Sequence, residues 1–161
     1  MTRMTARQLA YQLLFSMTEN RLDPEDAISL FFSEDHYDSL KEEDLIFQEY
    51  PDDHQLQYIR NILDLVCGNQ PAIDEIIRKY AKGWKLERLS NTSVSILRFA
   101  VCEILYVDDV PAAVAVNEAV DLAKRYESPQ AASFINGVLG SWLRAENEAE
   151  HQEADLSADC T

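Results

Sequence analysis

The side chains that most often carry acid–base, nucleophilic or metal chemistry are poorly placed for it in this chain of 161 residues. His36, His54 and His151 lie in acidic stretches, where neither a catalytic partner nor a desolvated site is expected. The cysteines are three in number and widely spaced, which suits neither a disulfide framework nor a zinc site. The sequence also lacks a glycine-rich phosphate loop, a zinc-protease motif and a nucleophile elbow. We therefore predict no catalytic residue, no cofactor and no metal, and a protein that is not an enzyme.

The charge distribution leaves binding of an anionic partner open, although the net charge is −15. Residues 1–18 carry two arginines and no acid, whereas residues 19–53 carry 13 acids against two bases. Residues 72–145 carry nine of each sign, and residues 146–161 carry six acids and no base. Phosphate must be neutralised by lysine and arginine. Because the excess acid is confined to one internal segment and the tail, the rest of the chain is able to present local basic patches.

Apolar residues recur at helical spacing along most of the chain, and no strand-like alternation is found. We predict an all-α fold of about seven helices in two packed three-helix bundles. The expected helices are 5–17, one opening at Asp23-Pro24, 53–67, 71–83, 92–107, 112–126 and one from Pro129 to about 145.

The remaining segments are predicted from their composition. Gly68-Asn69-Gln70-Pro71 is expected to stop one helix and start another, so residues 1–145 divide into subdomains of about 1–68 and 69–145. Residues 34–53 are expected to form an acidic insert, a loop with a helical turn near Lys41–Phe47, and 84–89 a short turn anchored by Trp84. Residues 146–161 have too little apolar content to offset the conformational entropy lost on ordering, so we predict a disordered acidic tail.

No run of eighteen apolar residues and no signal-like N-terminal stretch is present, so we expect a cytoplasmic protein without a membrane partner. Arg98 lies in an otherwise apolar helix and is expected to pair with Glu103 or a nearby carbonyl.

Four motifs occur in a recognisable order in the second half of the chain: WKLERL at 84–89, ILRFAVCEIL at 96–105, AVNEAVDLAK at 115–124 and FINGVL at 134–139. Together they resemble the NusB family of transcription antitermination factors over roughly residues 73–140. Residues 6–15 also look like that family's first helix.

The resemblance implies a function. NusB proteins bind the single-stranded boxA sequence of nascent ribosomal RNA as a heterodimer with NusE, a ribosomal small-subunit protein. With other Nus factors the complex travels with RNA polymerase and suppresses premature termination. Some members form homodimers, and the sequence leaves monomer and homodimer open.

The resemblance also implies RNA-contacting residues. The family's arginine-rich N-terminal arm is reduced here to Arg3 and Arg7, and Arg7 matches the last arginine of the arm. For both the alternative is a solvated surface residue. Losing phosphate contacts should weaken affinity and flatten its salt dependence.

Other candidates lie further along the chain. Gln12 and Phe15 fall where the family's first helix approaches RNA, and Phe15 is equally suited to core packing. Lys124, beside Arg125, is able to contact phosphate. Phe134 and Asn136 belong to the Phe-x-Asn-Gly motif at the other side of the implied RNA surface, and Asn136 has a structural alternative in hydrogen bonding a helix end. The NusE surface is placed on helices 71–83 and 92–107 without a named residue.

Two alternatives stay open. An acidic protein-interaction module of the same fold, with weak or lost RNA binding, would explain the depleted arm and the net charge. The helical module also resembles the N-terminal domain of an RNA cytosine methyltransferase family. That interpretation requires a Rossmann-like domain with a glycine-rich loop, which this sequence lacks.

Overall fold

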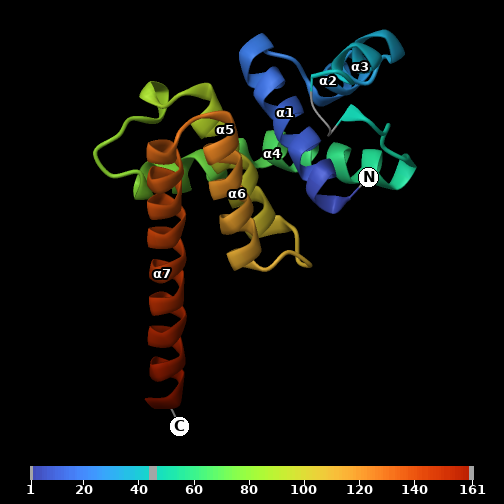
Figure 1. The fold of residues 1–161 in the computed structure, drawn as a ribbon. Coiled ribbons are helices and arrows are strands. Elements are labelled where there is room, and N and C mark those ends of the chain that lie inside the picture. Colours follow the sequence, from blue (N-terminus) through green and yellow to red (C-terminus); the bar gives the residue numbers. More distant parts are fainter. Residues whose placement is uncertain (1, 44–46, 160–161) are drawn as a thin grey trace.

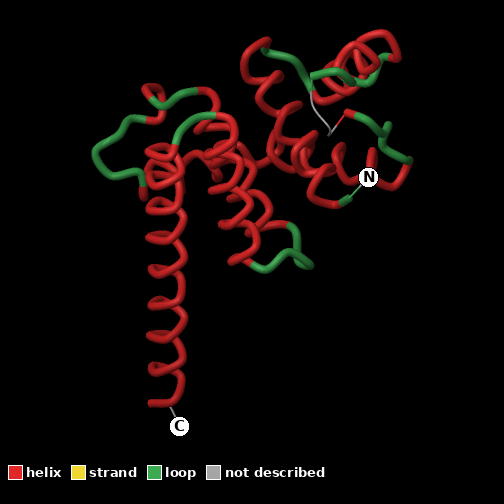
Figure 2. Tube along the Cα trace, viewed as in Figure 1, coloured by secondary structure: helices red, strands yellow, loops and turns green. Residues whose placement is uncertain are grey.

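A computed structural model of the protein describes residues 2–43 and 47–159, and these residues form an all-helical fold with no strand (Figures 1 and 2). The elements are α1 (Arg3–Asn20), α2 (Pro24–Phe31), α3 (Glu34–Leu40), α4 (Asp53–Tyr80), the 3-10 helix η2 (Leu86–Arg88), α5 (Asn91–Tyr106), α6 (Ala112–Tyr126) and α7 (Pro129–Asp159). The predicted fold class and the seven helices are confirmed, with changes in where two of the helices lie.

The N-terminal helices begin where the sequence supplies caps. Asp23 accepts a hydrogen bond from the backbone N–H of Asp26 at the start of α2, with proline at the first helical position. Asp52 and Gln55 form a capping box at the start of α4. α1 packs against α2, α4 and α5, so it lies between the two halves of the molecule.

The break predicted at residues 68–71 is wrong, because α4 runs without interruption from Asp53 to Tyr80. Gly and Pro inside a helix cost about 1 and 3 kcal/mol. Here Gly68 and Pro71 lie on the exposed side of α4, where water can satisfy the freed carbonyl, and Asn69 donates a hydrogen bond to the carbonyl of Leu65 at 2.8 Å. The buried stripe stays in phase across this turn and outweighs the local cost: Ile59, Ile62, Leu63, Val66, Ile73 and Ile77. The subdomain boundary proposed near residue 68 therefore falls within one helix.

The acidic segment is more ordered than a loop. Residues 34–40 form α3, and Tyr37 on this helix is 1% exposed. Its ring packs edge-on against Phe47 at 5.9 Å and Tyr50 at 5.2 Å, and its hydroxyl donates to the carbonyl of Glu49 at 2.6 Å. The carboxylates point to solvent while the aromatic rings turn inward, so one segment is both acidic and anchored. The helical turn predicted near Lys41–Phe47 falls partly on residues 44–46, outside the described residues.

The C-terminal half consists of α5, α6, α7 and the second half of α4. α5 is buried on most of its surface, and Arg98 on it forms a two-pronged ion pair with Asp74 of α4 at 2.8 and 3.0 Å. The predicted pairing with Glu103 is wrong, because residues five apart on a helix face directions about 140° apart. Leu86, not Trp84, anchors the 84–89 segment: Leu86 is 7% exposed and Trp84 is 58% exposed.

α7 continues as one helix to Asp159 and projects well beyond the other helices (Figure 1), where a disordered tail was predicted. The added turns are rich in alanine and glutamate, which have high helix propensity. The side chains of residues 146–153 are all exposed. The prediction of disorder rested on the low apolar content of this segment alone. It did not include the high helix propensity of its residues, which favours extension of a helix that is already formed.

Deleting residues 147–161 is expected to leave the melting temperature within about 3 °C of the full-length value. Exposed residues contribute less than about 0.5 kcal/mol each way when they make no special contact, and residues 147–153 bury nothing. Circular dichroism of both chains during heating measures the difference. A fall of about 10 °C would instead show that the end of α7 packs against the body of the protein.

No helix among the described residues is long and apolar enough to cross a membrane.

Candidate nucleic-acid interface

Arg7 lies inside the protein. Its side chain is 8% exposed, and its Nε donates to Oε2 of Glu103 on α5, which is 1% exposed, at 3.0 Å. Burial alone would lower the pKa of Arg7, but the carboxylate of Glu103 outweighs burial and holds the pKa above its ordinary value. This burial speaks against the RNA contact predicted for Arg7, because a guanidinium held by a buried carboxylate cannot reach a phosphate.

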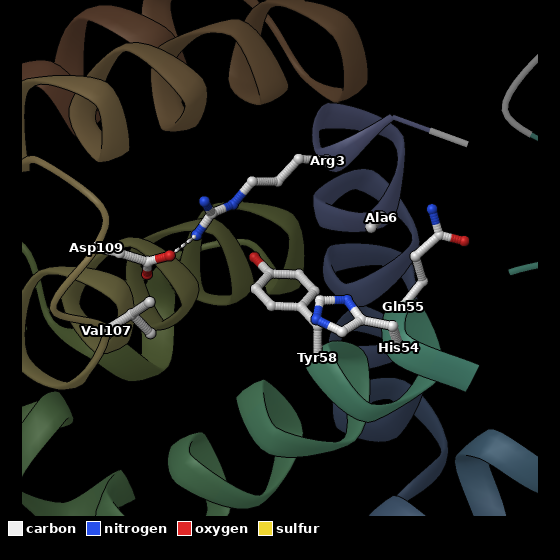
Figure 3. Close-up of a pocket in the computed structure, with 7 residues that line it drawn as sticks. All are labelled: Arg3, Ala6, His54, Gln55, Tyr58, Val107 and Asp109. Atoms are coloured by element: carbon white, nitrogen blue, oxygen red, sulfur yellow. Dashed lines mark hydrogen bonds and ion pairs between the residues drawn. The ribbon is translucent and has the colours of Figure 1, made fainter. Parts of the chain in front are cut away.

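Arg3 lies one turn earlier on the same side of α1. It lines a pocket of about 300 Å³ between α1, the start of α4 and the α5–α6 connection, and Figure 3 shows its guanidinium beside Asp109. Its Nη2 is 3.0 Å from Oδ2 of Asp109, and both side chains are largely exposed. Exposed pairs exchange readily with solvent ions. Arg3 is therefore accessible but sits beside a competing carboxylate.

Gln12 and Phe15 face a different direction from the arginines, toward the end of α6. Gln12 donates from Nε2 to the hydroxyl of Tyr126 at 2.9 Å. The Tyr126 ring lies 5.2 Å from that of Tyr11, and Phe15 lies 6.5 Å from Tyr11. Phe15 is partly buried against the core, which matches the packing interpretation, while Gln12 is partly exposed beside α6.

Lys124 lies at the rim of a hollow of about 420 Å³ between α1 and the last turns of α6. The hollow is lined by Met4, Gln8, Glu118, Asp121, Leu122, Lys124 and Arg125. Lys124 is exposed, and the guanidinium of Arg125 lies 5.5 Å from the Tyr126 ring centre. Arg125 therefore lies next to the aromatic contact between α1 and α6, while Lys124 shares its hollow with the carboxylates of Glu118 and Asp121.

Phe134 lies on the first turns of α7 and meets Trp84 of the loop between α4 and η2. The two rings are 5.8 Å apart at 62°, an edge-to-face contact. They share a hollow of about 250 Å³ with Arg88, Leu89 and Glu127, among other residues. Asn136 is exposed on α7 but lines neither this hollow nor the one at Lys124.

Glu127 follows Tyr126 directly and lines the hollow that holds Trp84 and Phe134. Its carboxylate accepts hydrogen bonds from the hydroxyls of Ser90 at 2.6 Å and Ser93 at 2.5 Å, at the start of α5. The end of α6 is thereby fixed against both α1 and α5. We use the name basic–aromatic strip for the exposed Trp84, Arg88, Lys124 and Arg125 together with the half-buried Gln12, Tyr126 and Phe134.

The structure thus places Gln12 and Lys124 at or near the end of α6 and Phe134 beside Trp84 at the start of α7, whereas Arg7 is buried against Glu103. Sequence reasoning missed Trp84, Arg88 and Tyr126. A signal was available for the first two: lysines, an arginine and aromatic rings interleave at 79–88, a composition typical of nucleic-acid surfaces. Among the described residues, no group of three potential metal ligands comes together.

The chain is similar to one protein family and to several of its members. The model of the NusB family matches residues 4–144. The transcription antitermination protein NusB of Natranaerobius thermophilus is 37% identical over 151 residues, which cover 92% of this chain and 99% of that protein. The protein of the same description from Clostridium botulinum is 38% identical over 144 residues, 89% of this chain and all of the other.

Solved structures share the fold. NusB of T. maritima superposes with a TM-score of 0.74 at 26% identity, covering 89% of this chain and 92% of that one. A complex of the antitermination factors NusB and NusE with dsRNA contains a chain that superposes with a TM-score of 0.70 at 22% identity, covering 89% and 96% of the two chains. The second likeness, at this identity, supports the fold alone.

Proposed function

The chain belongs to the NusB family, and from this premise we propose that it binds boxA-type RNA of nascent ribosomal transcripts together with NusE in an RNA polymerase complex. Its relatives are transcription antitermination proteins, so the chain is a factor of this kind and not an enzyme. The proposed mechanism is tethering: RNA held by a polymerase-bound protein forms a loop and gains effective concentration without catalysis. The proposed place of action is the cytoplasm, where bacterial transcription occurs.

The basic–aromatic strip is the observation that carries this proposal. Single-stranded RNA is commonly bound by a cationic track combined with rings on which bases stack. Lys124 and Arg88 are exposed; Arg88 shares a hollow with Trp84 and Phe134, and Lys124 shares one with Arg125, whose guanidinium lies 5.5 Å from the Tyr126 ring centre. The acidic groups that dominate the net charge lie mostly in residues 19–53 and 146–161, away from these residues in the sequence.

The partners are proposed from the family. The similar solved complex contains NusB, NusE and dsRNA. For this chain we propose an unpaired RNA stretch, because side chains can stack on bases only where they are not paired. Since Arg7 is buried and Arg3 is ion-paired, the phosphate contacts are assigned to Lys124, Arg125 and Arg88. Other Nus factors and RNA polymerase would be contacted indirectly.

RNA binding is tested by fluorescence anisotropy of a labelled boxA-type RNA titrated with the chain and NusE at several salt concentrations. Lys124→Ala is expected to weaken binding about threefold to tenfold and to reduce the slope of log affinity against log salt by about 0.7, because one phosphate contact is lost. Phe134→Ala is expected to weaken binding about tenfold through lost stacking.

Arg144→Ala is the matched control. It removes the same charge from an exposed position on α7, where Nη2 of Arg144 donates a hydrogen bond to the hydroxyl of Ser141 on the same helix. If the chain with NusE shows no salt-dependent binding, or if all three variants bind alike, the RNA proposal fails. The acidic protein-interaction module, supported by the net charge of −15, then becomes the better account.

A further inference from the structure

Trp84 lies in the turn that follows α4, and it has the largest exposed fraction of the aromatic side chains among the described residues. Its side chain is 58% exposed, and the turn that holds it is defined by Gly83, whose φ of 82° favours glycine. The backbone N–H of Trp84 donates to the carbonyl of Ala81 at 3.1 Å. The backbone of the residue is therefore fixed while its indole stays at the surface, as expected of a ring that serves a ligand rather than the core.

The indole borders two hollows of different character. On one side is the apolar hollow of about 250 Å³ that it shares with Phe134 and Leu89. On the other is a polar hollow of about 320 Å³ lined by Gly83, Trp84, Lys85 and Arg88. Arg88 lines both hollows. Lys85 and Arg88 are exposed and form no ion pair among the described residues, so their charges are available to an anion.

We propose that this corner is a subsite for one nucleotide of single-stranded RNA. The base packs against Trp84 and Phe134, and the phosphate lies between Lys85 and Arg88. The proposal rests on the RNA-binding function proposed above and names residues outside the family motif of the N-terminal arm. A hollow of about 250 Å³ is smaller than the roughly 300–1,000 Å³ of sites for drug-sized ligands, which suits a single base.

Glu127 determines where the phosphate lies in the subsite and which base the subsite prefers. Its carboxylate lines the apolar hollow, where it repels phosphate and so leaves the cationic hollow to the RNA backbone. Each carboxylate oxygen accepts one serine hydroxyl and retains a lone pair for a further donor. A base with an exocyclic amino group can donate to it, whereas uracil presents two carbonyl oxygens beside its single N–H. The subsite therefore prefers the bases with an amino group, adenine, cytosine and guanine, over uracil.

Tryptophan emission tests the subsite directly. The chain has two tryptophans, and Trp142 is 3% exposed, so added RNA can reach only Trp84. The chain with NusE is titrated with single-stranded adenine-rich and uracil-rich RNA decamers, and affinity is followed in parallel by anisotropy. We expect the adenine-rich RNA to quench emission in the wild type. The Trp84→Phe variant should lose this quenching and keep most of its affinity, because phenylalanine still stacks.

Affinity gives the second readout. Trp84→Ala is expected to bind the adenine-rich RNA about tenfold more weakly. The double variant Lys85→Ala/Arg88→Ala is expected to lower the salt slope by about 1.4, or 0.7 for each phosphate contact. Glu127→Gln is expected to reduce the preference for adenine over uracil. All these positions are exposed, and circular dichroism checks that each variant is folded.

The outcomes separate the two proposals. If RNA binds with the expected loss on Lys124→Ala but without quenching, and Trp84→Ala binds as the wild type does, the subsite is refuted and the RNA function stands. If the wild type binds boxA-type RNA but neither decamer, the subsite is refuted and the RNA function stands; if it binds none of the three RNAs, both proposals fail. Quenching that is equal for the two RNAs and unaffected by Glu127→Gln overturns the assigned base preference.

Discussion

Replacing Arg7 by alanine is expected to lower the free energy of unfolding by about 3–5 kcal/mol, the loss typical of a buried ion pair that is deprived of one partner. The substitution leaves the carboxylate of Glu103, which is 1% exposed, without its cation. Tyr58 packs nearby, and its buried hydroxyl oxygen does not supply a replacement cation. Urea unfolding followed by circular dichroism measures the loss as a fall in the transition midpoint without a change in slope.

Arg3→Ala is a matched control on the same face of α1. Its ion pair with Asp109 has side-chain exposures of 49% and 69%, so its loss should cost less than about 1 kcal/mol. The double variant Arg7→Met/Glu103→Leu removes both buried charges and fills their space with apolar atoms, and it should recover most of the stability lost on Arg7→Ala. A single variant as stable as Arg3→Ala, or a double variant no better than the single, would contradict the assignment of Arg7 to the core.

The double variant also decides between the two roles of Arg7. The family resemblance implied an RNA contact, and loss of binding by Arg7→Ala alone would be ambiguous because the variant is also destabilised. A folded Arg7→Met/Glu103→Leu protein is expected to bind RNA as the wild type does, since the guanidinium is only 8% exposed. Weaker binding by the folded double variant would restore Arg7 to the RNA surface.

Helix type and most helix starts could be predicted from the sequence because they depend on neighbouring residues. Asp23 and Asp52 cap helices that begin where their side chains can accept backbone N–H groups. The run from Gly68 to Pro71 led to a wrong prediction of a helix break because the structure there depends on distant residues. Its local preference for a break is outweighed by Ile73 and Ile77, which extend the buried stripe of α4 and pack against distant helices.

The candidate site was predictable only in part, because it is built from contacts between elements. The resemblance pointed to Gln12 and Lys124, which lie at or near the end of α6, and to Phe134, which contacts Trp84. That Arg7 turns toward Glu103, 96 positions later in the chain, depends on how α1 packs on α5. The partnership of Trp84 and Phe134 likewise requires the start of α7 to lie beside the 81–90 loop, which no local pattern specifies.

The second substitution with a large expected effect on stability lies in the acidic segment at residues 34–53. Tyr37→Ala is expected to lower the free energy of unfolding by about 3–5 kcal/mol, as for other large aromatic truncations in a core. The ring is 1% exposed and contacts Phe31, Phe32, Phe47 and Tyr50. Its removal leaves a cavity between α2 and α3, so both urea unfolding and proteolysis within residues 34–53 should become easier. A loss below about 1 kcal/mol would show that this segment is an exposed loop and that Tyr37 does not belong to the core.

Tyr37→Phe separates the hydroxyl from the ring. It keeps the packing and removes only the hydrogen bond to the carbonyl of Glu49, so a cost of about 1 kcal/mol is expected. Burial raises the pKa of Tyr37 from 10.0 to about 12, so the folded protein holds the phenol proton more tightly than the unfolded chain does. The resulting contribution to stability is complete below pH 10 and is lost as the pH rises through about 12. Unfolding measured across this range should therefore depend less on pH in Tyr37→Phe than in the wild type, and an unchanged dependence would mean that the phenol is not buried in the folded state.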